Sequence, residues 1–267
     1  MAFATTGCSS LFYFPRIQKH KFFEPEKVPL KYEDVEYQLD DGTGIHGWWF
    51  PSETTPAKGT VVFFHGNGEN LTSHFMSLSW LPPAGYNYFI FDYPGYGVSE
   101  GEPTPKNTLE TGKKALKWVH VNKDPSPLIV YAQSLGGNIG YRATLDMKDE
   151  VPIRNLILDS TFLSYRSIAR QKAALSWITW LLQPVAWLVM TDAYAPKELD
   201  KRGNIPLLVI HGEADIVIPI VEGEKIFRAS PEPKEFWRIP DGRHGDTFWR
   251  HEKVYQKKFL EYLDRYN

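Results

Sequence analysis

The 267-residue sequence has little cysteine: Cys8 is the only one, so an internal disulfide or a zinc site built on several cysteines cannot form. It also lacks an excess of charge, with 30 basic and 32 acidic residues and a net charge of −2. A nucleic-acid-binding domain usually carries a basic excess, so we expect no nucleic-acid partner. With 42% hydrophobic and 23% charged residues, the composition excludes a disordered chain, a collagen and a repetitive coil.

The N-terminus lacks the basic and long apolar segments of a complete signal peptide. Yet residues 6–10 (TGCSS) resemble the lipid-attachment box of bacterial lipoproteins, with Thr5 where leucine is usual. Two interpretations stay open. If the sequence is a trimmed precursor, a lipidated Cys8 anchors the protein at the cell envelope and brings it to a membrane surface; otherwise the terminus is an exposed tail of a cytoplasmic protein. We treat residues 1–30 as an N-terminal segment and 31–267 as one domain.

Short apolar runs alternate with stretches of helical periodicity, which is typical of a mostly parallel α/β sheet with helices on both faces. We predict eight strands, the first two in an antiparallel hairpin, at residues 32–39, 45–50, 61–64, 86–91, 128–132, 156–158, 207–210 and 236–239. Helices are expected at residues 108–121, 138–147, 220–229 and 248–266. Each later strand ends in a polar loop, and ligands bind at that carboxyl edge of such sheets.

The sequence AQSLGG at residues 132–137 follows a buried-strand run and precedes a helix, which is the context of a nucleophile elbow. The sharp turn needs small residues two positions from the serine, and Ala132 and Gly136 supply them. It also directs the start of the next helix at the exposed hydroxyl. We therefore expect Ser134 to be the nucleophile and the Leu135 N–H to donate to an oxyanion. The alternative is a small residue in an ordinary strand–helix turn.

A serine hydroxyl needs an adjacent base, and that base needs a carboxylate to orient it. Asp215 and His244 both follow later strands, in the chain order Ser, Asp, His that this kind of sheet uses. We predict His244 as the base and Asp215 as the orienting acid. Asp159, which ends another strand, stays an alternative acid. Asp246 is interpreted as an N-cap or first-turn residue of the next helix.

The glycine-rich loop HGNGEN at residues 65–70 follows the first parallel strand, where the second oxyanion donor is expected. Its glycines let the backbone approach a substrate closely. We predict the Asn67 N–H as the donor paired with Leu135, and Gly68 stays an alternative. A plain glycine-rich turn is the other interpretation of this loop.

Four motifs after successive strands carry a family resemblance: HGNG at 65–68, FDYPGYG at 91–97, QSLGG at 133–137 and HGEAD at 211–215. Together they resemble α/β-hydrolase-fold serine hydrolases, in particular the branch of monoacylglycerol-lipase-like esterases and protein depalmitoylases. The resemblance covers roughly residues 30–265. It implies an eight-stranded α/β-hydrolase sheet, ester or thioester hydrolysis through an acyl-enzyme, and no cofactor or metal. Ala132 and Arg243 stand where many members have glycine, and neither change removes a catalytic group.

Residues 173–190 contain no charged side chain and are long enough to be considered as a membrane span. However, a proline interrupts them, and a span would put two strands of one sheet on opposite sides of a membrane. We predict instead a short helical cap inserted at about residues 163–203. Trp177, Trp180 and Leu181 fall on one helical face there, where they line an acyl pocket, touch lipid or simply pack on the sheet.

These patterns predict a serine hydrolase that cleaves a small-molecule or lipid acyl ester or thioester. Two alternatives stay open. The first is a serine peptidase of related fold that acts on short peptides, and an acidic pair that anchors a peptide amine would favour it. The second is a lipid-binding protein without catalysis, which a fluorophosphonate probe that labels Ser134 would exclude.

Overall fold

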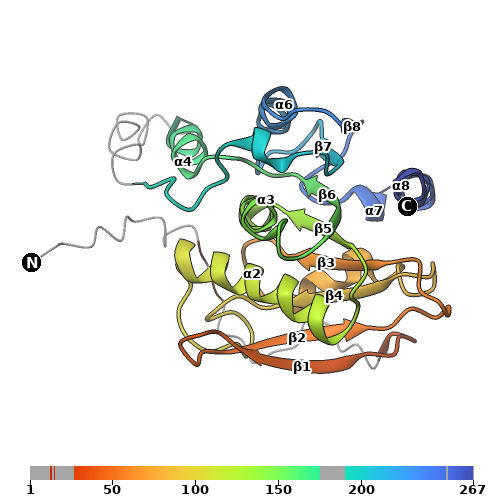
Figure 1. Cartoon of the computed structure of the whole chain (residues 1–267). Coiled ribbons are helices and arrows are strands. Elements are labelled where there is room, and N and C mark those ends of the chain that lie inside the picture. The colour runs from red at the N-terminus through yellow and green to blue at the C-terminus, as the bar shows by residue number, and fades with distance from the viewer. Residues whose placement is uncertain (1–12, 14, 16–26, 175–189, 251, 267) are drawn as a thin grey trace, which may run out of the picture.

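A single eight-stranded sheet organises the chain, and the computed structural model describes residues 13, 15, 27–174, 190–250 and 252–266. Its strand order is β1-β2-β4-β3-β5-β6-β7-β8 (Figure 1). The strands are β1 (Glu33–Gln38), β2 (Gly44–Phe50), β3 (Thr60–Phe64), β4 (Asn87–Phe91), β5 (Leu128–Gln133), β6 (Ile153–Asp159), β7 (Leu207–Gly212) and β8 (Lys234–Ile239). β2 pairs antiparallel with β1 and β4, and the remaining pairs are parallel. The predicted fold class is thus confirmed.

The helices lie on both faces of this sheet (Figure 1). They are α1 (Leu71–His74), the 3-10 helix η3 (Phe75–Leu78), α2 (Pro105–Asn122), α3 (Leu135–Met147), α4 (Tyr165–Ala174), the 3-10 helix η5 (Leu199–Arg202), α6 (Ile220–Ala229), α7 (Thr247–Arg250) and α8 (Glu252–Arg265). One face packs against α2, α3 and α6, and the other against α1, η3, α7 and α8.

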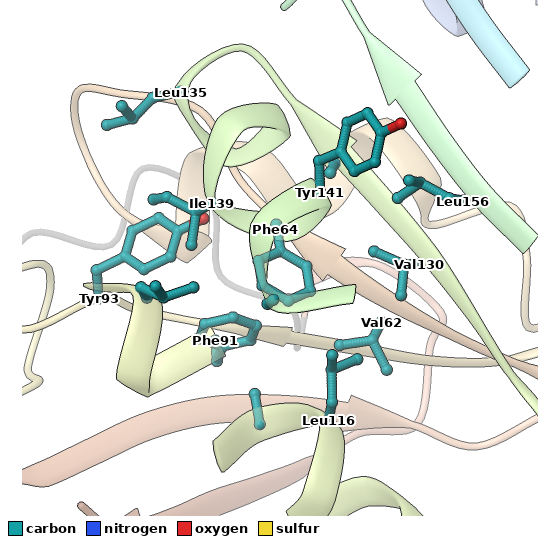
Figure 2. Packing of buried hydrophobic residues seen from close by; sticks show 14 of the residues in the cluster. Val62, Phe64, Phe91, Tyr93, Leu116, Val130, Leu135, Ile139, Tyr141 and Leu156 are labelled. Carbon is teal, nitrogen blue, oxygen red and sulfur yellow. The ribbon is translucent and has the colours of Figure 1, made fainter. Parts of the chain in front are cut away.

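The central strands are buried along their whole length, as their continuous apolar sequences predict. All residues of β3 and β5 are buried, whereas the edge strand β1 alternates between exposed and buried positions from Asp34 to Gln38. Figure 2 shows the core on the α2/α3 face, where Val62, Phe64 and Val130 pack with Leu116 and Ile139. The opposite face is richer in aromatic contacts, and Trp48 and Trp237 are buried there.

The helices α2 and α3 each begin three residues before the predicted start, for local reasons. α2 begins three residues before the predicted start, because Thr104 and Asn107 form a reciprocal capping box and Pro105, the first helical residue, suits the first turn. α3 begins at Leu135, directly after Ser134, and not at residue 138. The single helix expected at 248–266 is described as two helices, α7 and α8, on either side of residue 251, which the structure does not describe.

The predicted cap lies in the connection between β6 and β7, and the structure describes α4 and η5 within it. Trp177, Trp180 and Leu181 lie outside the described residues, as does Cys8. Asp192 fastens the two stems of the insert, because its carboxylate accepts from the Ser164 hydroxyl at 2.8 Å and the Arg166 N–H at 3.3 Å. Over the described part of the chain, every helix is too short or too polar to cross a membrane.

Candidate active site

The turn between β5 and α3 holds Ser134 in a strained backbone conformation, with φ 54° and ψ −122°. A non-glycine residue rarely adopts a positive φ, and such strain persists only where the surrounding structure enforces it. Here the Ser134 N–H donates to the Asp159 carbonyl oxygen at 2.9 Å. A Cβ on Gly136 would overlap with the carbonyl oxygens of Phe64 and His65, so α3 can begin this close to β3 only with glycine there. The elbow predicted from the sequence is present.

Ala132, one of the two departures from the family pattern, is accommodated by the next helix. Its methyl group faces Gly140 of α3, where an added Cβ would lie 2.7 Å from the Ala132 Cβ. β5 and α3 can therefore pack closely with alanine at 132, because the facing position on the helix is a glycine. Arg243, the other departure, is exposed on the loop after β8.

The side chains of Ser134, His244 and Asp215 form one hydrogen-bonded chain, although they come from the ends of three different strands. His244 Nε2 lies 2.9 Å from Ser134 Oγ, and His244 Nδ1 lies 2.8 Å from Asp215 Oδ2. The Asp215 side chain is buried, whereas that of His244 is 24% exposed. This order of contacts can move a proton from the hydroxyl to the ring while the carboxylate fixes the ring's orientation.

Asp215 is held by its own loop as well as by His244. Its Oδ1 accepts from the N–H groups of Val217 and Ile218, each at 2.8 Å, and His211 Nε2 lies 3.5 Å from its Oδ2. Burial acts to raise the pKa of Asp215, but the hydrogen bond and charge of His244 and the backbone N–H groups outweigh it and lower this pKa. The carboxylate therefore stays ionised beside the histidine.

The two other aspartates considered from the sequence have different partners. Asp159 accepts hydrogen bonds from Tyr131 at 2.6 Å and Ser160 at 2.9 Å, and burial raises its pKa. Asp246 directly precedes α7, as predicted for a helix-start residue, and its carboxylate accepts from the Arg243 N–H and pairs with Arg250. It is therefore Asp215 that contacts the ring of His244.

The glycine-rich loop passes close to the nucleophile. A Cβ on Gly66 would lie 3.3 Å from the Ser134 Cβ, so the loop brings its backbone within reach of a group bound to the serine. Leu135 is the first residue of α3, where N–H groups have no partner inside the helix. The Gly68 N–H already donates to Asn67 Oδ1 at 2.8 Å, and Tyr96 donates to the same oxygen at 2.8 Å. The Gly68 N–H would have to exchange this bond before it could donate to an oxyanion.

Two residues of the site were not identified from the sequence, although one of them lies in a family motif. Gln133 precedes the nucleophile, and its amide donates to the Gly245 carbonyl oxygen at 3.3 Å. The Ser160 hydroxyl accepts from the Gly245 N–H at 3.1 Å. Both polar backbone groups of the residue after His244 are thus fixed. Within the described residues, no group of three His, Cys, Asp or Glu side chains is arranged to hold a metal ion.

Comparisons with known proteins place this chain in a family. Residues 55–202 match the family described as serine aminopeptidase S33. The uncharacterized protein YfhR of Salmonella typhimurium is 35% identical over 95% of this chain and 90% of its own length. The α/β hydrolase domain-containing protein WAV2 of Arabidopsis thaliana is 28% identical over 94% of this chain and 85% of its own.

Among solved structures, an esterase of Pyrococcus furiosus, Pf2001, superposes with a TM-score of 0.74. The two share 22% sequence identity, and the alignment covers 96% of this chain and 98% of the esterase. At this identity the likeness supports the fold alone, which is that of an α/β hydrolase.

Proposed function

We propose that this chain, which belongs to the serine aminopeptidase S33 family of α/β hydrolases, is a serine hydrolase that cleaves carboxylic esters or thioesters. The observation that carries the proposal is the chain of contacts from Ser134 through His244 to Asp215, with distances of 2.9 and 2.8 Å, at a strained elbow. Strain of this kind is typical of functional sites, because it exposes a reactive group at a fixed position.

In the first step, Ser134 Oγ attacks the carbonyl carbon while His244 Nε2 takes the hydroxyl proton. Asp215 stabilises the imidazolium that forms and keeps the Nδ1 hydrogen directed at its own carboxylate. The negative oxygen of the tetrahedral intermediate accepts hydrogen bonds from the N–H groups of Asn67 and Leu135. Collapse of the intermediate expels the alcohol or thiol, which receives the proton from His244.

In the second step, His244 takes a proton from water, and the resulting hydroxide attacks the acyl-enzyme. The same two N–H groups hold the second oxyanion, and Ser134 recovers its proton as the acid leaves. All groups needed for both steps come from the loops at one edge of the sheet. The cycle requires only acyl ester and water as reactants.

The ester class is supported by the family resemblance of the motifs and by structural neighbours with esterase names. The family description names an aminopeptidase, which is why a peptide substrate is the second candidate. The two differ in the leaving group and in the need to hold a charged substrate amine. Aminoacyl p-nitroanilides compared with p-nitrophenyl esters of matched acyl groups separate them, and faster cleavage of the anilides would favour the peptidase.

The nucleophile is tested with a fluorophosphonate probe and Ser134→Ala. We expect the probe to label the native protein at Ser134, and the variant to lose nearly all turnover while keeping its thermal transition. His244→Ala should lower kcat on the order of 10³-fold or more. Full activity of the Ser134 variant would overturn the proposal.

The acyl pocket predicted at Trp177, Trp180 and Leu181 is tested by substrate length. If these side chains bind an acyl chain, kcat/KM on p-nitrophenyl esters should rise from acetate to longer chains, and Trp177→Ala should flatten the rise. Equal rates on acetate and longer esters would contradict the pocket. The matched control is Trp249→Ala, because Trp249 is exposed on α7.

A further inference from the structure

The proposed mechanism leaves one histidine beside the nucleophile without a role. His74 ends α1, and its Nε2 lies 3.2 Å from the Gly68 carbonyl oxygen in the glycine-rich loop. A Cβ on Gly66 would lie 3.3 Å from the Ser134 Cβ and 3.5 Å from His74 Cε1. Gly66 therefore lies next to both the nucleophile and this imidazole.

The same imidazole also interacts with the residue that precedes the nucleophile. The side chain of Gln133, the residue before Ser134, interacts with the His74 ring and acts to raise its pKa, against the larger effect of burial. Gln133 in turn donates to the carbonyl oxygen of Gly245, the residue after His244. One side chain thus joins the glycine-rich loop to the elbow, and through Gln133 to the loop of the base.

The ring has a fixed protonation state. Burial lowers the pKa of His74 to about 3, and the nearby His65 adds to this effect. The ring is therefore neutral near pH 7, with one nitrogen as donor and the other as acceptor. Because a carbonyl oxygen can only accept, the hydrogen lies on Nε2 and is donated to Gly68. The ring stacks on that of His65, with centroids 5.0 Å apart and planes at 24°.

The glycine-rich loop needs such support. Gly68 has φ 82° and the next residue, Glu69, has φ 59°. A glutamate at positive φ is unfavourable, so neighbouring contacts must hold the loop in this conformation. The His74 hydrogen bond is made to the carbonyl group between these two residues, so it restrains the loop one residue after Asn67.

We propose that His74 is a positioning residue, which holds the glycine-rich loop against the elbow so that the Asn67 N–H meets the oxyanion. This inference rests on the proposed function, because an oxyanion donor has a role only if Ser134 attacks a carbonyl group. Oxyanion donors act at 2.7–3.1 Å from the charged oxygen. A small displacement of the donor therefore destabilises the transition state more than it weakens substrate binding.

The test compares two replacements of His74. His74→Leu fills the space without a donor, whereas His74→Gln places an amide N–H near the position of Nε2. We expect His74→Leu to lower kcat by about 10- to 100-fold with KM nearly unchanged, a smaller loss than removal of a whole donor. His74→Gln should recover most of kcat. Inhibition by an alkylboronic acid, which forms an anionic tetrahedral adduct on the serine, should weaken in parallel with kcat/KM.

The serine hydrolase function and the positioning role of His74 can fail independently. His46→Leu removes a histidine of β2 that forms a hydrogen bond with Asp34 of the edge strand β1. It should change the thermal transition but not kcat. If the native protein is not labelled by fluorophosphonate, the proposed function fails. If it is labelled, the inference is overturned by an unchanged kcat in His74→Leu, or by equal losses in both His74 variants that follow their thermal transitions. If His74→Leu does not fold, His74→Ala is judged by the same criteria.

Discussion

The carboxyl ends of β6 and β7 lie side by side, and each carries a buried aspartate, but the two carboxylates have opposite electrostatic environments. Asp215 Oδ2 lies 2.8 Å from a histidine ring, and its pKa is lowered. Asp159 receives hydrogen bonds from Tyr131, Ser160 and Gln133, all neutral donors, and burial raises its pKa. A buried carboxylate at a strand end is thus not enough to make an orienting acid.

The loop geometry explains the difference. Asp159 is the last residue of β6. Its Oδ2 accepts from the β5 side chains of Tyr131 and Gln133, and its Oδ1 accepts from Ser160. Asp215 lies three residues beyond the end of β7, on a turn closed by its own contacts with the Val217 and Ile218 N–H groups. That turn moves the carboxylate out of the sheet and toward the loop that carries His244. Both aspartates lie at the carboxyl ends of neighbouring strands, and the conformation of the loop after β7 determines that Asp215 contacts His244.

The largest expected difference between Asp215 and Asp159 is in catalysis. Asp215→Asn should lower kcat by roughly 10³- to 10⁴-fold, because an amide favours the wrong tautomer of the base. Asp159→Asn should keep kcat within about 10-fold, since its side chain acts on the site only through Gln133 and Ser160. Steady-state kinetics on one ester measures both. Comparable losses in the two variants would show that Asp159 shares the orienting role.

The next effect is on stability. Tyr131→Phe removes the 2.6 Å hydrogen bond to the Asp159 carboxylate inside the core and should lower the free energy of unfolding by about 1.5–3 kcal/mol. Tyr88→Phe is the matched control, because its buried hydroxyl donates to the Phe75 carbonyl oxygen at 3.3 Å, a neutral and longer bond. Its loss should be about 0.5–1.5 kcal/mol. Urea unfolding measures both, and equal losses would mean that the Asp159 carboxylate adds nothing to its bond.

The same two aspartates show how far sequence reasoning extends into this site. The places of Ser134, Asp215 and His244 could be predicted because each follows a recognisable apolar strand in a fixed chain order. The sequence also offered Asp159 as an acid, since it too ends a strand. What decided between them is a turn made by backbone N–H groups, which no residue pattern in the HGEAD motif specifies.

The supporting residues were beyond prediction for a related reason. His74 and Ser160 act through contacts with Gly68 and Gly245, which are distant in sequence or belong to other loops. Their partners are backbone atoms, and backbone atoms leave no mark on the sequence. The fold itself was more accessible, because β3 and β5 need long apolar runs to be buried on both faces. The start of α3 was misplaced because its first turn is made of the small residues that the elbow requires.

The smallest expected effect is on the pH dependence of stability, and it should have opposite signs for the two aspartates. The lowered pKa of Asp215 means that its contribution is present above the unfolded pKa of about 3.9 and is lost as pH falls through the folded value. The raised pKa of Asp159 means that its contribution is present below about 3.9 and is lost as pH rises through the folded value. Urea unfolding between pH 3 and 7 measures both variants against the native protein.

Asparagine cannot ionise, so each variant removes one of these pH-dependent contributions. The stability advantage of the native protein over Asp215→Asn should shrink as pH falls, because protonation removes the negative charge that accepts hydrogen bonds from His244 and the backbone N–H groups. Its advantage over Asp159→Asn should shrink as pH rises, because ionisation then places a charge among neutral hydrogen-bond donors. Slopes of the same sign would mean that the two carboxylates share one environment, and the contrast between the ends of β6 and β7 would then be wrong.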